Sequence, residues 1–453
     1  MPPPTGADPR PFVVIGTTVV AKRVCGTLAS LGEDVLHLAE PTEDDLRAAT
    51  ARRPRGVAIL VHDDVACLRY ALTVAHMRPQ VRLVVSIFDR TVAEQLRRVM
   101  PACVIASPAD VAAPTLAAAC LNTDLLAVWR APDGPTGVRR TPDGFAVTGY
   151  PLPGHLRWRT RLGRLRGQLR PHDSGSRMLL AGLAGLAAVL SADWLWLFLR
   201  HHLDPVTALY EAVRVVATVG PADDPGTSVR YRLFAAAAML ATIVFTAVFT
   251  AGIVHRALNG RTFGLIGHRA PPVDGHVVVV GMGQVGLRLC LALKDLGIGV
   301  VAVERDPDAD NLRIAKQSRV PVLVAHGSDR RVLTRLRLHR AIALAVVGSD
   351  ELDNIAVALT GLAVAPRVRV VLRAGDSEAM AETRSLFRIA EIRDVTAMSA
   401  TFVVLALRRV DPAHLCSDGL HVYAQLGGAE FAECTSGVAA ACRHLEFAPG
   451  AAG

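Results

Sequence analysis

The sequence predicts an α/β protein that is also a membrane α-helical protein, with two Rossmann-like domains on either side of a two-helix transmembrane module. Three observations lead to this fold class. Residues 178–199 and 233–254 form two apolar runs of 22 residues each. A glycine-rich fingerprint follows a buried-strand pattern at residues 276–286. A degenerate copy of that pattern begins around Gly16, 265 positions earlier.

The composition favours a membrane surface over nucleic acid as the partner of the basic residues. The 453 residues carry a formal net charge of +9, and 51% of them are hydrophobic. Seven Arg cluster directly before the first apolar run, between positions 157 and 177, and such clusters suit anionic lipid. The eight Cys form no disulfide framework, which fits a reducing compartment. Cys416, Cys434 and Cys442 near His444 match no zinc spacing, so no metal is expected.

Residues 11–130 predict a degenerate Rossmann domain. The offset of 265 that relates Gly16 to Gly281 also places Cys25 on Cys290. Two of the three fingerprint glycines are absent, and the acid Glu40 falls one position late, which on a strand turns its side chain to the other face. A structural, docking role is therefore expected for this copy rather than nucleotide binding.

A linker region follows at residues 131–177. Residues 131–154 are rich in Pro and Gly and predict a linker or a small hairpin. Residues 155–170 combine Arg with apolar residues at helical spacing. This pattern predicts a basic amphipathic helix that lies on lipid, and a plain charged linker is the alternative.

The two apolar runs predict transmembrane helices within a module that covers residues 178–257. Each run of 22 residues would span about 33 Å, and a hydrocarbon core is about 30 Å thick. Two buried core helices are the alternative, although such helices rarely stay apolar on every face. Ten Arg flank the pair and four lie between. A multi-pass protein of the cell (inner or plasma) membrane is therefore expected, with both termini cytoplasmic.

The segment between the two runs predicts a re-entrant loop at residues 204–224. Asp204 suits an N-cap and Pro205 suits the first helical position. Residues 206–217 contain no helix breaker and would span about 18 Å, roughly half a membrane. The irregular stretch TVGPAD follows at residues 218–223. Irregular backbone at membrane depth is tolerated only where it is buried in protein or lines a wet cavity.

The TVGPAD stretch resembles the TVGYGD filter of two-helix potassium channels, at the matching place between the helices. The resemblance implies an ion pathway for potassium lined by Thr218, Val219 and Gly220. It also implies a homotetramer around a central pore. Pro221 fixes φ, and Ala222 replaces a glycine that adopts positive φ cheaply. These two residues depart from the channel pattern.

Arg214 lies four residues before Thr218 on the expected half-length helix. An unpaired cation at this depth would repel cations and be costly. We expect Arg214 to pair with Asp223 or Asp224, and an Arg that faces an extracellular vestibule is the alternative.

A dinucleotide-binding fingerprint begins the second Rossmann domain. Residues 276–280 predict a buried strand, a glycine turn and a helix follow, and a second strand ends at Glu304, 18 residues beyond Gly286. The glycines let a phosphate reach the helix N-terminus, and the acid is placed for ribose hydroxyls. NAD(H) or an adenine nucleotide, ATP or ADP, is therefore expected rather than NADP. The residues expected to bind it are Gly281, Gly283, Gln284, Val285, Gly286, Glu304 and Arg305.

Residues 274–410 resemble the RCK, or TrkA-N, domain family. Four more strands are predicted at residues 320–325, 342–347, 368–372 and 391–395. The resemblance implies nucleotide contacts from the turn after the third strand, the helix after the fourth and the end of the fifth. These residues are Ser328, Asp329, Asn354 and Arg373. RCK domains commonly occur as docked pairs. Residues 411–453 form a short C-terminal extension with no predicted role.

The combined prediction is a potassium-channel-like membrane protein that mediates or regulates monovalent cation transport and is gated by a nucleotide on its C-terminal RCK domain. The alternative is a non-conducting, membrane-anchored NAD or adenine-nucleotide sensor that regulates a separate transporter, which Pro221 and Ala222 favour. A dehydrogenase is a third interpretation, but no substrate domain or catalytic His or Lys constellation is evident, so no enzyme is expected. The expected partners are membrane lipid and further copies of the chain, and not nucleic acid.

Overall fold

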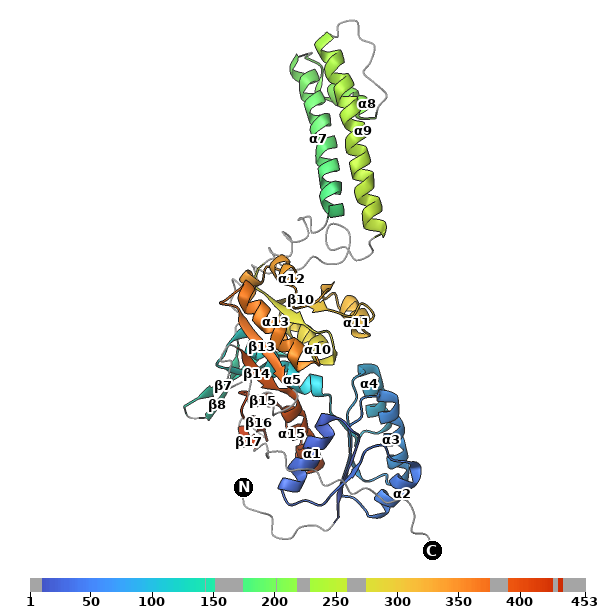
Figure 1. Cartoon of the computed structure of the whole chain (residues 1–453), viewed down its shortest axis with the longest axis vertical. Helices are drawn as coiled ribbons and strands as arrows, with labels where there is room; N and C mark the ends of the chain where they lie inside the picture. The colour runs from blue at the N-terminus through green and yellow to red at the C-terminus, as the bar shows by residue number, and fades with distance from the viewer. Residues whose placement is uncertain are drawn as a thin grey trace. The chain divides into compact units, whose positions relative to one another are not determined.

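A computed structural model of the chain describes residues 10–142, 144–150, 174–200, 202–217, 229–258, 274–374, 390–426 and 431–434. The chain divides into two compact units, one formed by Met1–Arg161 with Pro272–Gly453 and the other by Leu162–Pro271. The first unit contains two parallel sheets of Rossmann type, and the second contains long apolar helices (Figure 1). The predicted fold class is therefore confirmed.

The second Rossmann domain is a six-stranded parallel sheet in the order β11-β10-β9-β12-β13-β14. This is the doubly wound order 3-2-1-4-5-6, in which ligands bind where the strand order reverses, here between β9 and β12. All six predicted strands are present. The elements are β9 (His276–Val280), α10 (Gln284–Asp295), β10 (Gly299–Glu304), α11 (Asn311–Gln317), β11 (Val322–Val324), α12 (Arg330–Arg335), the 3-10 helix η1 (Leu338–Arg340), β12 (Ala343–Val346), α13 (Glu351–Val364), β13 (Arg369–Ala374), β14 (Glu391–Asp394) and α15 (Val395–Leu407).

The N-terminal domain repeats this plan with one unit missing. Its sheet has the order β2-β1-β3-β4-β5, and β3 pairs with β1 as β12 pairs with β9. Within residues 10–142 the chain passes from α2 directly to β3, so β11 and α12 have no counterpart. The elements are β1 (Phe12–Ile15), α1 (Val19–Ser30), β2 (Val35–Leu38), α2 (Glu43–Ala51), β3 (Gly56–Ile59), α3 (Asp64–Met77), β4 (Arg82–Val85), α4 (Arg90–Val99), β5 (Val104–Ile105) and α5 (Pro108–Leu121).

The two domains exchange their last helices. Helix α5 follows β5 of the N-terminal sheet, yet Leu116 packs with Val277 and Leu289 of the C-terminal domain. Helix α15 follows β14 of the C-terminal sheet, yet Leu407 packs with Phe12 of the N-terminal domain. Each sheet therefore has one face covered by a helix from the other half, and two separate apolar clusters contain residues of both halves.

Equivalent arginines on the first helix of each domain anchor these exchanged helices. Arg23 of α1 forms an ion pair of 2.9 Å with Asp394, the N-cap of α15. Arg288 of α10, at the same offset of 265, forms an ion pair of 3.1 Å with Asp110 in the first turn of α5. The two ion pairs occupy equivalent positions in the two repeats. This indicates that the two halves are related by a local two-fold axis.

A second matched pair of arginines contacts the far ends of the same helices. Arg82 of β4 donates to the carbonyl oxygen of Ala406 at 3.0 Å. Arg369 of β13 donates to the carbonyl oxygen of Ala119 at 3.5 Å. Both acceptors lie in the last turn of an exchanged helix, and the carbonyl oxygen of Ala406 also accepts from the amide of Arg409 at 3.1 Å.

Two small antiparallel sheets pack together beside the exchanged helices. Their shared core includes Leu126, Val138, Cys416 and Tyr423. The strands are β6 (Leu125–Ala131), β7 (Gly134–Thr141) and β8 (Gly144–Gly149) in one sheet and β15 (Leu415–Ser417), β16 (Val422–Gln425) and β17 (Phe431–Cys434) in the other. Strands β7 and β8 form a hairpin inside the predicted linker region. The expected amphipathic helix lies outside the described residues.

The membrane unit contains α7 (Ser174–Arg200), α8 (Pro205–Val216) and α9 (Val229–Leu258). Residues Arg177–Arg200 and Val229–His255 are long and apolar enough to cross a membrane, and only 17% of each apolar window is buried. That exposure contradicts the alternative of two buried core helices. Helices α7 and α9 approach closely at Gly185, where a Cβ would overlap the ring of Phe245. Small residues commonly allow such close contacts between membrane helices.

Helix α8 starts as the sequence predicts. The Asp204 side chain accepts a hydrogen bond of 3.1 Å from the amide of Val206, and Pro205 occupies the first helical position. Arg214 forms an ion pair of 3.2 Å with Glu211, one turn earlier on the same helix. The expected partners of Arg214, residues 223 and 224, lie outside the described residues.

Candidate functional site

The glycine-rich loop after β9 lies at the reversal point of the C-terminal sheet. Gly281 has φ +94, and a Cβ on it would lie 2.8 Å from the Cα of Gly348. A Cβ on Gly286 would overlap the carbonyl oxygen of Gly281. At both positions the neighbouring backbone leaves no room for a side chain, with or without a ligand. Nothing lies within 4 Å of a Cβ on Gly283, which leaves open space above the start of α10.

The amino end of α10 has no side-chain cap. Gly283 is the N-cap residue and makes no side-chain hydrogen bond, so the first amides of the helix lack a partner from that residue. Such amides, together with the helix dipole, form a site for a phosphate group. Gln284 is the first residue of the helix, and Val285 is buried in the core. Only the backbone of Val285 is therefore placed to contact a ligand.

Glu304 lies at the carboxyl end of β10, directly beside the glycine loop. Its Oε2 accepts a hydrogen bond of 2.6 Å from the amide of Met282, and its Oε1 accepts one of 3.0 Å from the amide of Asp306. Both carboxylate oxygens retain further lone pairs, so the group can also accept from hydroxyl donors. Arg305 follows on the exposed surface.

The loop after β12 forms the opposite side of the site. Asn354 is buried, and its Nδ2 donates to the carbonyl oxygen of Gly348 at 3.0 Å. A Cβ on Gly348 would lie 2.7 Å from the Oδ1 of Asn354. Asn354 therefore braces the loop that packs against Gly281. The sequence prediction missed Gly348, although a glycine two residues beyond the fourth strand parallels Gly281 beyond the first.

The remaining predicted residues lie around the carboxyl edge of the sheet. Arg373 is half-buried at the end of β13, where burial lowers the pKa of its guanidinium and the nearby Glu351 acts against that shift. Ser328 and Asp329 are exposed after β11. The Asp329 carboxylate accepts a hydrogen bond of 2.8 Å from the amide of Arg331 and caps α12.

The corresponding loop of the N-terminal domain is closed by its own side chains. Thr18 caps α1 by accepting from the amide of Ala21 at 3.1 Å, and its hydroxyl donates to the carbonyl oxygen of Leu60 at 2.9 Å. His37 lies 2.8 Å from the carbonyl oxygen of Gly16 through Nε2. These side chains cap α1 and contact the loop from within the N-terminal domain, and the absence of a nucleotide from this copy stays a prediction.

Two further predictions concern parts that the structure does not cover. Thr218, Val219 and Gly220 lie outside the described residues, as do Cys442 and His444. Across the described ranges, no group of three or more His, Cys, Asp or Glu side chains could bind a metal ion.

Comparison with known proteins relates the second Rossmann domain to a family. The family model of the TrkA-N domain matches residues 277–395. The crystal structure of the GsuK RCK domain is similar at 13% identity and a TM-score of 0.49, over 90% of this chain and 78% of that one. The GsuK channel structure is similar at 14% identity and a TM-score of 0.49, over 90% of this chain and 65% of that one.

A curated relative is similar over a shorter range. The formate-dependent phosphoribosylglycinamide formyltransferase of Salmonella schwarzengrund (strain CVM19633) is 29% identical over 92 residues, which are 20% of this chain and 24% of the relative. The chain thus spans about a quarter of the length of that relative. The expectation that the chain is not an enzyme stays a prediction. Residues 277–395 are a TrkA-N domain, in a chain that also has two helices long and apolar enough to cross a membrane.

Proposed function

We propose that this chain is a potassium-channel-like membrane protein that mediates or regulates monovalent cation transport under the control of a nucleotide bound to its TrkA-N domain. One observation carries the proposal. Uncapped amides of α10 lie beside an obligatory glycine loop and the fixed carboxylate of Glu304, in the same chain as two exposed, membrane-length apolar helices.

The nucleotide is NAD(H) or an adenine nucleotide, ATP or ADP. Its phosphates lie over Gly283, where the start of α10 has open space. Its ribose hydroxyls donate to Glu304, since a carboxylate at this point favours a free 2′-hydroxyl over a 2′-phosphate. Four other predicted residues complete the site around the carboxyl edge, namely Ser328, Asp329, Asn354 and Arg373.

The membrane unit provides the ion pathway. Helices α7 and α9 cross the bilayer, both termini are cytoplasmic, and four copies surround a pore lined by Thr218, Val219 and Gly220. The ion pair of Arg214 with Glu211 supports this role because it leaves no net charge from these two residues on α8. Membrane lipid is the other partner, and no nucleic acid is involved.

Coupling between the two units follows from chain connectivity. The chain leads from α9 through residues 259–273 directly to β9, the strand that precedes the glycine loop. A nucleotide can shift the equilibrium of the pore only by the difference in its affinity for the two states. A change in the loop after β9 on nucleotide binding is therefore transmitted to α9.

The nucleotide part is tested by calorimetric titration of the full-length protein with NAD, ADP and NADP. Glu304→Gln should weaken NAD binding about tenfold or more, because it removes a charged acceptor. Asp308→Asn is the matched control, since Asp308 is an exposed acid nearby, and should bind like the wild type. Equal NAD affinity of all three proteins would remove Glu304 from the site.

The second candidate function is a non-conducting sensor that regulates a separate transporter. Pro221 and Ala222 favour it, because they replace the residues that give the channel filter its geometry. Potassium flux through liposomes that contain only this protein separates the two functions. Flux supports the channel. Its absence at every nucleotide concentration, for protein that binds NAD, supports the sensor.

A further inference from the structure

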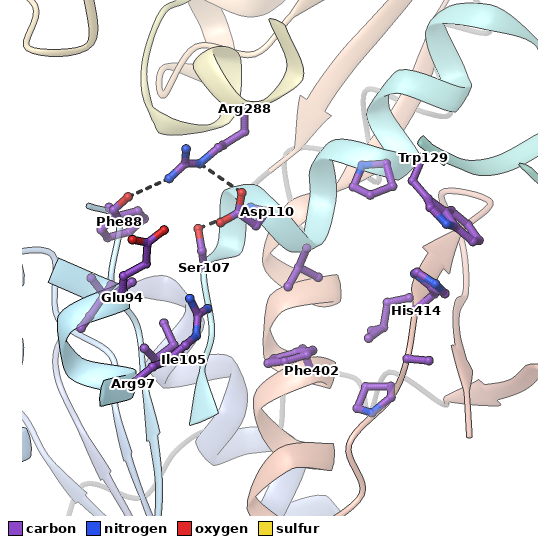
Figure 2. Close-up of a pocket in the computed structure, with 17 residues that line it drawn as sticks. Phe88, Glu94, Arg97, Ile105, Ser107, Asp110, Trp129, Arg288, Phe402 and His414 are labelled. Carbon is purple, nitrogen blue, oxygen red and sulfur yellow. Dashed lines mark hydrogen bonds and ion pairs between the residues drawn. The ribbon is translucent and has the colours of Figure 1, made fainter. Parts of the chain in front are cut away.

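A cavity of about 480 Å³ lies where the N-terminal domain meets the exchanged part of the C-terminal half and α10 (Figure 2). Its walls come from α4, β5 and α5 on one side and from β6, α15 and the residues before β15 on the other. The volume lies in the range of pockets that enclose small organic molecules, about 300–1,000 Å³. None of the residues proposed to bind the nucleotide or to line the ion pathway lines this cavity.

One wall of the cavity is aromatic and uncharged. The rings of Trp129 and His414 stack with centroids 3.9 Å apart and an interplanar angle of 22°. Burial lowers the pKa of His414, which favours the neutral imidazole. Phe402 of α15 adds a further ring to the lining, and Phe88 lies across the cavity from Trp129, beside Arg288 (Figure 2). This wall is suited to a large apolar side chain or a planar group.

Two of the four charged groups in the lining neutralise each other. Arg288 forms an ion pair of 3.1 Å with Asp110, and it also donates to the carbonyl oxygen of Phe88 at 2.9 Å. The equivalent pair of Arg23 and Asp394 anchors the other exchanged helix. The pair of Arg288 and Asp110 therefore has a structural role and adds no net charge to the cavity.

Glu94 and Arg97 are the other two charged groups. They lie one turn apart on α4, both are exposed, and both line the cavity (Figure 2). Neither forms an ion pair with any side chain that the structure describes. Ser107 lines the cavity next to them, and its Oγ accepts from the amide of Asp110 at 3.4 Å. The hydroxyl proton of Ser107 is thus free to be donated to a ligand.

We propose that this cavity binds a free α-amino acid with a large apolar side chain. The guanidinium of Arg97 binds the carboxylate of the amino acid, the carboxylate of Glu94 binds its ammonium group, and the rings of Phe88, Phe402 and Trp129 surround its side chain. The recognition depends on one unpaired charge of each sign beside an apolar wall. A ligand with a single charge leaves one of the two groups without a partner, and such a group costs free energy when a ligand covers it.

The amino acid is a second regulatory ligand of the protein, and it binds at a site separate from that of the nucleotide. The lining comes from both halves of the chain, so a bound molecule contacts α4 of one half and His414 of the other. Ligands that bind only the docked arrangement stabilise it by mass action. The amino acid therefore strengthens the docking of the two Rossmann domains whether or not the protein conducts ions.

The test is isothermal titration of the purified full-length protein with L-phenylalanine, L-leucine and L-tryptophan. Phenethylamine lacks the carboxylate of phenylalanine, and 3-phenylpropionate lacks its ammonium group. Each of these two analogues should bind at least about tenfold more weakly than L-phenylalanine, which corresponds to about 1.4 kcal/mol. Arg97→Gln and Glu94→Gln should each weaken binding of L-phenylalanine by a similar factor.

Arg98→Gln is the matched control, because Arg98 is the exposed neighbour on α4 and does not line the cavity. It should bind L-phenylalanine like the wild type. Melting curves of the variants confirm that they fold, which is expected for exposed positions. The proposal is overturned if none of the three amino acids binds at millimolar concentration, if the singly charged analogues bind as well as L-phenylalanine, or if Arg97→Gln binds like Arg98→Gln.

Discussion

Single residues without side chains determine the shape of the nucleotide site. Gly281 and Gly286 lie against each other, and Gly281 also packs on Gly348. The fingerprint in the sequence predicts the first two, because its spacing requires them to meet at a helix start. Gly348 belongs to a different loop, the one after β12. The pairing of β9 with β12 brings this loop beside Gly281. No local pattern contains that information.

Two glycine substitutions should have different effects on stability. Gly286→Ala forces a Cβ onto the carbonyl of Gly281, whereas Gly283→Ala has open space. We expect Gly286→Ala to lower the melting temperature and abolish NAD binding. Gly283→Ala should keep the melting temperature but weaken NAD binding, because its methyl group occupies space for phosphate. Thermal unfolding and calorimetry of both variants check this, and equal melting temperatures would contradict it.

His276 should make the Rossmann unit less stable in mild acid. It is fully buried at the start of β9, and burial lowers its pKa from 6.5 to about 4. The unfolded chain therefore binds a proton that the folded chain excludes between these values. The contribution of His276 to the free energy of unfolding is complete above pH 6.5. It decreases as the pH falls, by about 2 kcal/mol at pH 5.

The variant His276→Gln tests this contribution, because an amide can still donate to the carbonyl oxygen of Leu336, which lies 3.0 Å from the Nε2 of His276. The melting temperature of the wild type should fall more between pH 7 and pH 5 than that of the variant. An identical fall in the two proteins would show that His276 does not titrate in this way.

At the scale of secondary-structure elements, the exchanged helices are the part that the sequence predicts least well. Residues Pro108–Leu121 and Val395–Leu407 are short apolar helices, and a helix that is apolar on all sides is expected to be buried. Their apolar composition indicates burial but contains no information about which sheet buries them. That choice depends on distant contacts such as Arg23 with Asp394, which no spacing rule relates.

The strands and helix starts near the site are predicted better because their signals are local. The six strands of the C-terminal sheet are apolar runs that end at turn residues, and the N-cap Asp204 directly precedes a proline. The missing counterpart of β11 in the N-terminal domain was not predicted. The sequence match at the offset of 265 extends only over Gly16 and the helix after it. The later residues of the N-terminal domain contain no glycine pattern that would reveal the missing strand and helix.

The exchange of helices predicts a large effect from a single truncation in α15. Leu407 is 2% exposed and packs in the core of the N-terminal domain. Leu407→Ala should reduce the free energy of unfolding by about 2–5 kcal/mol, as for other buried Leu. It should also speed protease cleavage within residues 10–121, where its packing partners lie.

Leu420→Ala is the matched control, because Leu420 lies between β15 and β16 and is 69% exposed. It should change the free energy of unfolding by less than about 0.5 kcal/mol. Chemical denaturation and limited proteolysis of both variants provide the measurement. If Leu407→Ala behaved like Leu420→Ala, α15 would not be an essential cover of the N-terminal sheet.

At the scale of the whole molecule, one compact unit contains the TrkA-N domain and the other contains the membrane-length helices. The proposed function requires the state of one unit to change the other. Binding to the glycine loop and transport by the membrane unit should then be linked, and linkage implies that both respond over the same range of nucleotide concentration.

The most direct measurement of that linkage is potassium efflux from proteoliposomes, titrated with NAD on the side of the Rossmann domains and compared with NAD binding by the same preparation. Under the proposed function, efflux changes with the same midpoint as NAD binding, and Glu304→Gln shifts both midpoints by the same factor. Potassium efflux that is unchanged at NAD concentrations that saturate binding would contradict it.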